Sequence, residues 1–341
     1  MPRLAFSFPI SDEANFFAHY DILVQRPPSN TIASPLDYFY FFDRANLDKN
    51  NPNLRPERTI DYEVGFQQKL SNSSALKIAA YYKEMRDMIQ LRTFFPVPVI
   101  GRYTTFDNLD FGTVKGFSFA YDLRRTGNIS LNLNYTLQFA DGTGSNAESQ
   151  RNVANRGVLR TLFPLNFDER HRLVAVMDYR YGSGKAYNGP RLFGADILAN
   201  AGLNLQATAV SGRPYTATLQ PLEFGGAGVV GSLNGARQPW NFVLNARIDK
   251  NFNIGKKMGV NVYCRVSNLL DRRNVIDVYS ATGSPDDDGY LASSFGQSQI
   301  QSIDASQRNV QAFLASYQWR MLNPNFFSIP RRIYLGAIFD F

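Results

Sequence analysis

Residues 129–139 read Ile-Ser-Leu-Asn-Leu-Asn-Tyr-Thr-Leu-Gln-Phe, with an apolar side chain at every odd position and a polar one at every even position. Successive side chains of a β-strand point to opposite faces, so this period of two predicts a strand. One face of that strand carries aliphatic and aromatic groups, whereas the other carries Ser, Asn, Thr and Gln.

The same alternation recurs along the chain. We expect about eleven strands, near residues 3–10, 15–25, 57–70, 75–91, 106–124, 128–140, 169–181, 201–212, 240–254, 259–270 and 331–341. Short turns near 11–14, 71–74, 125–127 and 255–258, with one longer connection near 182–200, alternate with long loops near 26–56, 92–105, 141–168, 213–239 and 271–330. Short turns at one end and long loops at the other are typical of an outer-membrane β-barrel.

Two soluble β architectures are less consistent with this pattern. A sandwich would bury one face of every strand in a packed core and would favour tight turns at both ends. Strands of about 10 to 14 residues suit a tilted membrane crossing better than the usual strand of five or six. A solenoid needs a fixed repeat period, and the sequence has none. The expected fold class is therefore all-β, an antiparallel transmembrane β-barrel.

Composition excludes several other classes. The 341 residues carry a formal net charge of +7, with 44% hydrophobic and 19% charged residues, which is too apolar for a disordered chain. The sequence contains no apolar run long enough for a transmembrane helix. The single cysteine, Cys264, excludes a disulfide framework and a cysteine-based zinc site. The basic residues are scattered, so we expect no nucleic-acid partner.

Three motifs resemble sites without meeting their requirements. Residues 226–231 match G-x-G-x-x-G, but no helix start follows to hold a phosphate. Residues 286–289 (Asp-Asp-Asp-Gly) lack the alternating ligands of a calcium loop and are expected to be a solvated acidic loop, with a loop-bound cation as the alternative. The two histidines, His19 and His171, fall on different strands without a nucleophile motif. We therefore expect no enzyme activity, cofactor or metal.

One helix is expected inside the last long loop. Residues 302–321 carry apolar side chains at helical spacing, with Ser302 or Asp304 as the N-cap. We expect this helix to pack on the mouth of the barrel, with a ligand lid as the alternative.

Charged residues on the polar faces of the strands are the candidate binding residues. In a barrel these faces line the lumen, where charges contact either an internal plug or a passing ligand. The candidates are Glu63, Asp122, Asp178, Arg180, Arg247, Asp249 and Arg265.

Three stretches resemble the C-terminal barrel half of TonB-dependent outer-membrane receptors. The first is Asn-Pro-Asn-Leu-Arg-Pro-Glu at 51–57 with Tyr-Glu-Val-Gly at 62–65. The second is Val-Ser-Asn-Leu-Leu-Asp at 266–271 with Asn274, and the third runs from Pro330 to a terminal aromatic, Phe341. The details are similar to the Bacteroidetes-type branch of the family.

The resemblance implies a 22-stranded barrel plugged by an N-terminal domain, of which residues 1–341 would be the second half. No signal peptide, TonB box or plug precedes Leu4, so we expect a fragment or a truncated gene. Eleven strands alone would leave two unpaired edges in lipid, where each unpaired backbone group costs several kcal/mol.

The function implied by the resemblance is energised uptake of a scarce nutrient across the bacterial outer membrane. The ligand class stays open between siderophore, cobalamin, oligosaccharide and peptide. The implied partners are outer-membrane lipid, the TonB complex acting through a plug domain, and the barrel assembly machinery acting on the strand that ends at Phe341. The alternative is a structural or adhesive outer-membrane barrel without transport.

Overall fold

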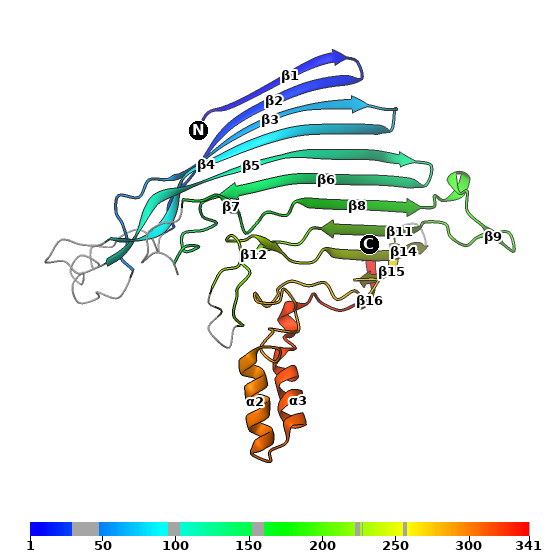
Figure 1. Ribbon diagram of the computed structural model, residues 1–341. Coiled ribbons are helices and arrows are strands. Elements are labelled where there is room, and N and C mark those ends of the chain that lie inside the picture. The colour runs from blue at the N-terminus through cyan, green and yellow to red at the C-terminus, as the bar shows by residue number, and fades with distance from the viewer. Residues whose placement is uncertain are drawn as a thin grey trace.

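The computed structural model describes residues 1–28, 48–94, 103–151, 160–221, 226, 228–254 and 258–340. Within these residues, eleven strands follow one another in sequence order as one antiparallel, curved and open sheet (Figure 1). They are β1 (Arg3–Ser11), β2 (Ala14–Gln25), β3 (Glu57–Lys69), β4 (Ser74–Phe94), β5 (Tyr103–Thr126), β6 (Ile129–Gly142), β8 (His171–Arg180), β11 (Ala201–Val210), β14 (Asn241–Ile254), β15 (Met258–Ser267) and β16 (Arg332–Asp340).

Shorter elements lie in the connections. They are β7 (Phe163–Pro164), which pairs with β6, the hairpins β9 (Arg191–Leu192)–β10 (Ala195–Asp196) and β12 (Pro214–Tyr215)–β13 (Ala236–Arg237), the 3-10 helices η2 (Gly184–Ala186) and η4 (Pro324–Phe326), and the helices α2 (Ser294–Ala305) and α3 (Val310–Met321). No helix in the described part of the chain is long and apolar enough to cross a membrane.

The predicted strands are confirmed, each to within three residues at its described ends. The register keeps the alternation in phase from strand to strand: Phe119 pairs with Tyr135, and Tyr135 pairs with Leu173. The adjacent row is polar, because Ser118 pairs with Thr136. The sheet therefore has one continuous apolar face and one continuous polar face. The terminal Phe341 and the turn residues 255–257 lie outside the described residues.

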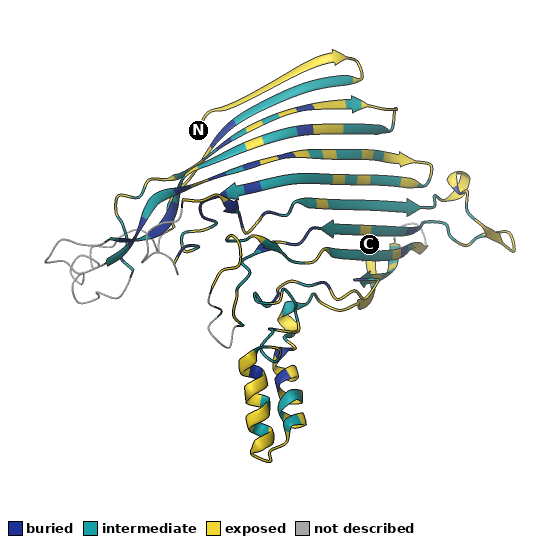
Figure 2. Cartoon of the chain, in the orientation of Figure 1, coloured by how far each residue is buried: buried dark blue, intermediate teal, exposed yellow. Residues whose placement is uncertain are grey.

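Within the described residues, no packed core lies against the apolar face. Many of its side chains are exposed, with Phe117 at 59%, Val64 at 49% and Leu335 at 81% exposure, and Figure 2 shows exposed and intermediate residues along the strands. Such a large exposed apolar surface is expected of a wall that faces lipid rather than water. A soluble sandwich would have covered it.

The small buried clusters lie instead near the long-loop end of the sheet. Leu165, in the connection after β7, packs on Val114 and Ala140 of the polar face. Ile89, Leu91 and Phe106 form a second cluster in the outer parts of β4 and β5. These clusters fix the loops but do not extend along the sheet. 

The motif at 51–57 has a structural role at a bulge in β4. The β4–β5 register shifts between Met85 and Met88, and Asp87 has a positive φ of 57°. The Glu57 carboxylate accepts a hydrogen bond from the Ile89 amide (2.8 Å), and Arg55 pairs with Asp87 at 2.7 Å. The end of the motif therefore secures the bulge.

The motif at 266–274 closes the outer ends of β14 and β15. Asn274 is buried, and its amide both donates to the Phe242 carbonyl and accepts from the Phe242 N–H, each at 2.8 Å. Asn268, with a φ of 53°, donates to the carbonyls of Arg272 (3.0 Å) and Ile329 (3.2 Å). The two asparagines replace ladder bonds where the strands end.

The expected single helix at 302–321 is wrong in extent. The structure has two helices, α2 and α3, separated at residues 306–309, and their N-caps are Ser293 and Asn309. The apolar residues that supported the prediction lie in α3, whereas α2 carries few large apolar residues. Figure 1 shows the pair projecting away from the sheet as an arm, rather than packed on the mouth.

The acidic loop is also not fully solvated. Asp288 is 1% exposed, and its carboxylate accepts hydrogen bonds from the Tyr317 hydroxyl (2.6 Å) and the Tyr290 amide (2.9 Å). Tyr317 belongs to α3, so Asp288 ties the base of the arm to the loop before it.

Candidate functional site

All seven charged candidates lie on the polar face of the sheet. The register puts Asp178 opposite Ser130 and Asn204, and Arg247 opposite Arg265, in rows that alternate with the Phe119 row. The strands of origin are β3 for Glu63, β5 for Asp122, β8 for Asp178 and Arg180, β14 for Arg247 and Asp249, and β15 for Arg265.

The structure brings four of the candidates together. Asp178, Arg180, Arg247 and Asp249 line one hollow of about 550 Å³ on the polar face, together with asparagines 204, 251 and 261. Arg265 is the cross-strand neighbour of Arg247.

The other two candidates lie apart from this group. Glu63 pairs with Lys77 at 3.5 Å, and Asp122 lines a separate hollow beside the short turn at 70–74. The seven residues therefore share a face but do not form one site.

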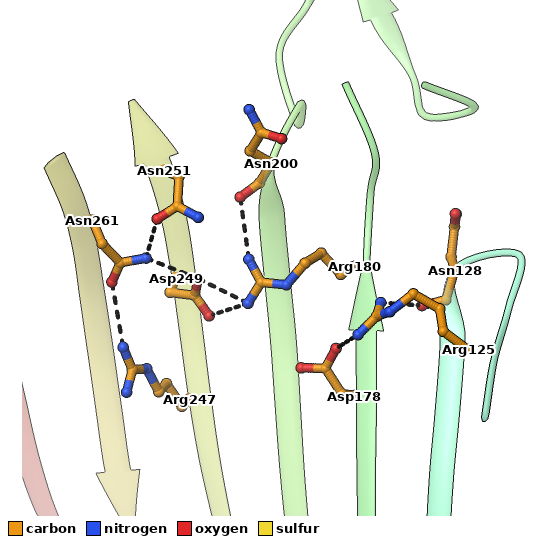
Figure 3. A network of polar contacts seen from close by, with 9 residues as sticks. All are labelled: Arg125, Asn128, Asp178, Arg180, Asn200, Arg247, Asp249, Asn251 and Asn261. Carbon is orange, nitrogen blue, oxygen red and sulfur yellow. Dashed lines mark hydrogen bonds and ion pairs between the residues drawn. The ribbon is translucent and has the colours of Figure 1, made fainter. Parts of the chain in front are cut away.

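The central group is a network of ion pairs and amides near the short-turn end (Figure 3). Arg180 Nη2 donates to both carboxylate oxygens of Asp249, at 2.8 and 2.9 Å. Asn261 Nδ2 donates to the same carboxylate at 3.1 Å and also to Asn251. Arg125 forms an ion pair with Asp178. Each of the two aspartates in the network thus has an arginine partner.

Arg247 is bound differently from Arg180. Its Nη2 donates to Asn261 Oδ1 at 3.3 Å, and its guanidinium lies 4.4 Å from the centroid of the Tyr263 ring. Its Nε is buried and has no hydrogen-bond partner in the described structure. This side chain is held in place but still has a free donor.

Sequence reasoning missed Arg125, Asn261 and Tyr263. Arg125 lies where the β5 strand reaches its turn, and only the fold shows that it reaches Asp178. Asn261 and Tyr263 fall on the polar face by alternation, but only charged residues were selected. Asn261 and Tyr263 could have been found from the same period of two, if amide and tyrosine side chains on the polar face had been selected along with the charged ones.

His171 and Asp168 are each held in separate contacts. His171 accepts or donates through Nδ1 to the Tyr135 hydroxyl at 2.8 Å and stacks on Trp240, on the apolar face. The sequence neighbour Asp168 is fully buried, bonded to the Ala140 amide (3.0 Å) and paired with Arg237. Among the described residues, no group of three or more His, Cys, Asp or Glu could hold a metal ion. The arrangement is suited to binding polar groups.

Comparison with a family model identifies the sheet. The model described as "TonB dependent receptor-like, beta-barrel" matches residues 1–269. The chain belongs to this family. No curated protein matches the sequence.

Solved TonB-dependent receptors and transporters have the same fold. The ferric-catecholate import receptor Fiu from Escherichia coli K12 is 12% identical, with a TM-score of 0.50 over 80% of this chain and 31% of that chain. The outer membrane transporter YddB from E. coli is 12% identical, with a TM-score of 0.51 over 78% of this chain and 36% of that chain. The FrpB iron transporter from Neisseria meningitidis is 13% identical, with a TM-score of 0.50 over 80% and 35% of the respective chains.

The chain thus spans about a third of the length of these proteins. Within a TonB-dependent receptor barrel, the apolar face of the sheet faces lipid and the polar face lines the lumen. The open sheet is a part of such a barrel wall. The central network lies on the polar face of this sheet, close to its short-turn end.

Proposed function

We propose that this chain forms part of an outer-membrane receptor that imports a scarce nutrient with energy from the TonB complex. The observation that carries the proposal is the continuous pairing of an apolar and a polar face across the sheet, in a chain of this family. Residues 1–341 would be the C-terminal part of the barrel domain, with a plug domain in the same receptor. The transported compound would belong to the siderophore, cobalamin, oligosaccharide or peptide class.

The lumen charges would then contact the plug or the passing compound rather than perform chemistry. Glu63, Asp122 and the central network offer carboxylates, guanidiniums and amides to the lumen, which are groups that bind polar partners reversibly. We propose no enzyme activity. Outer-membrane lipid would contact the apolar face, and the barrel assembly machinery would act on the strand that ends at Phe341.

The experiment compares wild-type cells with cells that lack the gene. Spent medium is analysed by mass spectrometry for compounds whose depletion requires the gene. A TonB-dependent importer predicts depletion that a protonophore abolishes, because transport needs the proton-motive force. An outer-membrane location is checked by fractionation, with an antibody to residues 271–330.

The alternative is a structural or adhesive barrel, whose outer loops act as an interaction surface. The projecting α2–α3 arm is the observation that favours it. That function predicts equal depletion of every compound in both strains, together with lost cell adhesion or envelope integrity in the deletion strain.

A further inference from the structure

Two arginines face each other on the lumen wall without an acidic partner. Arg247 of β14 is directly opposite Arg265 of β15, and both lie on the polar face. Like charges directly opposite in an antiparallel pair destabilise the sheet. The nearby arginines differ, because Arg125 pairs with Asp178 and Arg180 pairs with Asp249. Within the described residues, neither Arg247 nor Arg265 forms an ion pair.

The local charge is therefore unbalanced. The four arginines at 125, 180, 247 and 265 face two aspartates, 178 and 249, which leaves 4 − 2 = 2 positive charges. Both surplus charges lie on β14 and β15. A carboxylate placed there would offset one of the two surplus charges and weaken the repulsion between the arginines.

Arg247 is fixed in position before any anion arrives. The Tyr263 ring supports its guanidinium at 4.4 Å, and Asn261 accepts from one of its terminal nitrogens. Tyr263 in turn lies over Gly336, where an added Cβ would be 2.5 Å from the ring carbon Cζ. Such support lowers the entropy lost on binding, because the side chain is already ordered.

A hollow on the polar face is lined by both arginines. It measures about 250 Å³ and is lined by Arg247, Arg265, Tyr263, Tyr334 and Ser267, together with Ile338. Tyrosine and serine hydroxyls can donate to an anion. Guanidinium groups bind carboxylates through two parallel hydrogen bonds, which makes this set of residues suited to a carboxylate.

We propose that Arg247 and Arg265 form a carboxylate-binding site on the lumen wall. This proposal rests on the proposed function, because the carboxylate reaches the site through the lumen of a receptor. Its source is either an Asp or Glu side chain of the plug or a carboxylate group of the transported compound. 

The test uses the native-length protein purified from outer membranes in detergent, with citrate as the probe. The thermal unfolding midpoint is read from the heat-modifiable shift on gels, with and without citrate, against sodium chloride of equal ionic strength. The variants are Arg247→Gln/Arg265→Gln and Arg247→Lys/Arg265→Lys. Lys77→Gln is the matched control, since Lys77 is a lumen-face cation paired with Glu63 outside this hollow.

Each source predicts its own result. If the carboxylate comes from the transported compound, citrate raises the midpoint of the wild type and the control, and the Gln variant loses that rise. If it comes from the plug, citrate has no effect, the Gln variant unfolds at a lower temperature than the wild type, and the Lys variant retains most of the stability.

Three results would overturn the proposal. The first is that citrate has no effect and the Gln variant is at least as stable as the wild type. An empty site predicts this result, because the Gln variant only relieves the repulsion between the arginines. The second is a citrate effect that persists in the Gln variant. The third is no citrate effect with equal destabilisation by Gln and Lys, which indicates lost packing alone. None of these readouts depends on transport, so a failed uptake experiment would leave this result interpretable.

Discussion

Arg180 of β8 reaches across β11 to Asp249 of β14, and Gly202 of β11 lies beneath its guanidinium. Gly202 is the register partner of both residues, and a Cβ at this position would lie 2.5 Å from Arg180 Nη2. An ion pair between strands that are not neighbours thus depends on a missing side chain between them. The pair joins three consecutive strands of the lumen wall at 2.8 and 2.9 Å.

Gly202→Ala is expected to displace the Arg180 guanidinium and separate it from Asp249. Asp249 is 5% exposed, so losing one donor leaves a buried carboxylate less satisfied. We expect a loss of about 1–3 kcal/mol in the free energy of unfolding. The measurement is urea unfolding of the barrel, with Gly259→Ala as the control. Gly259 is a strand glycine of the same polar face whose added Cβ would meet only ordinary contacts, at 3.8 Å from Asp340 Cβ, so no ion pair is lost.

Leu133→Arg and Asn132→Arg test the assignment of the two faces. Leu133 lies in the apolar rows and Asn132 in the polar rows of β6, one residue apart. The first change places a charge toward lipid and is expected to cost about 2–4 kcal/mol near the membrane midplane. The second places the same charge in the lumen and should allow folding. Assembly is measured by heat-modifiable migration on gels, and equal yields of folded protein from both variants would contradict the assignment.

Tyr317→Phe is expected to loosen the α2–α3 arm without affecting the sheet. The change removes the hydroxyl that donates to Asp288 at 2.6 Å and leaves a buried carboxylate with one donor fewer. The expected cost is about 1–3 kcal/mol, confined to the loop that carries the arm. Limited proteolysis should cut the arm faster while the barrel band stays intact. The control is Trp319→Phe in α3, because Trp319 is 76% exposed.

Asp110 is expected to make the outer part of β4 and β5 sensitive to pH. Asp110 lies 126 − 110 = 16 residues from the short-turn end of β5, whereas a tilted membrane-crossing strand needs about 9–11 residues, so we place Asp110 outside the segment that crosses the membrane. Burial raises the pKa of Asp110, although hydrogen bonds from Gln90 (2.8 Å) and Thr143 (2.9 Å) and the charge of Arg160 lower it.

The sign of the effect follows from linkage. A carboxyl with a raised pKa binds its proton more tightly in the folded state than in the unfolded state, so protonation stabilises the fold. Stability in this region should rise as the pH falls through the folded-state pKa and should level off below the unfolded-state pKa. This change in local stability with pH is measured by hydrogen exchange of the β4 and β5 amides, corrected for intrinsic exchange rates. Asp110→Asn should remove the dependence, and an unchanged pH profile in that variant would contradict the assignment.

The alternation in segments such as 129–139 was enough to predict the eleven long strands of the sheet, though not the two-residue β7, and the face of each candidate charge. This is possible because the side-chain period of a strand is fixed by backbone geometry, and because lipid and lumen demand opposite chemistry from its two faces. The family resemblance at 51–57 and 266–274 was likewise visible in the sequence. The sequence did not reveal that Glu57 binds the backbone at a bulge or that Asn274 binds the backbone at a strand end.

The tertiary structure alone decided which polar residues meet. Arg180 and Asp249 are 69 positions apart, and their contact depends on register, strand order and the glycine between them. The Arg247–Arg265 pair, which forms no ion pair within the described part of the chain, is equally invisible in the sequence, because pairing between β14 and β15 sets which residues oppose each other. The start of α2 was not predicted, because this helix carries few large apolar residues and begins at a cap, where the Ser293 side chain accepts a hydrogen bond from the Gly296 N–H. Local periodicity thus determines the faces of this wall, whereas contacts across strands determine its binding groups.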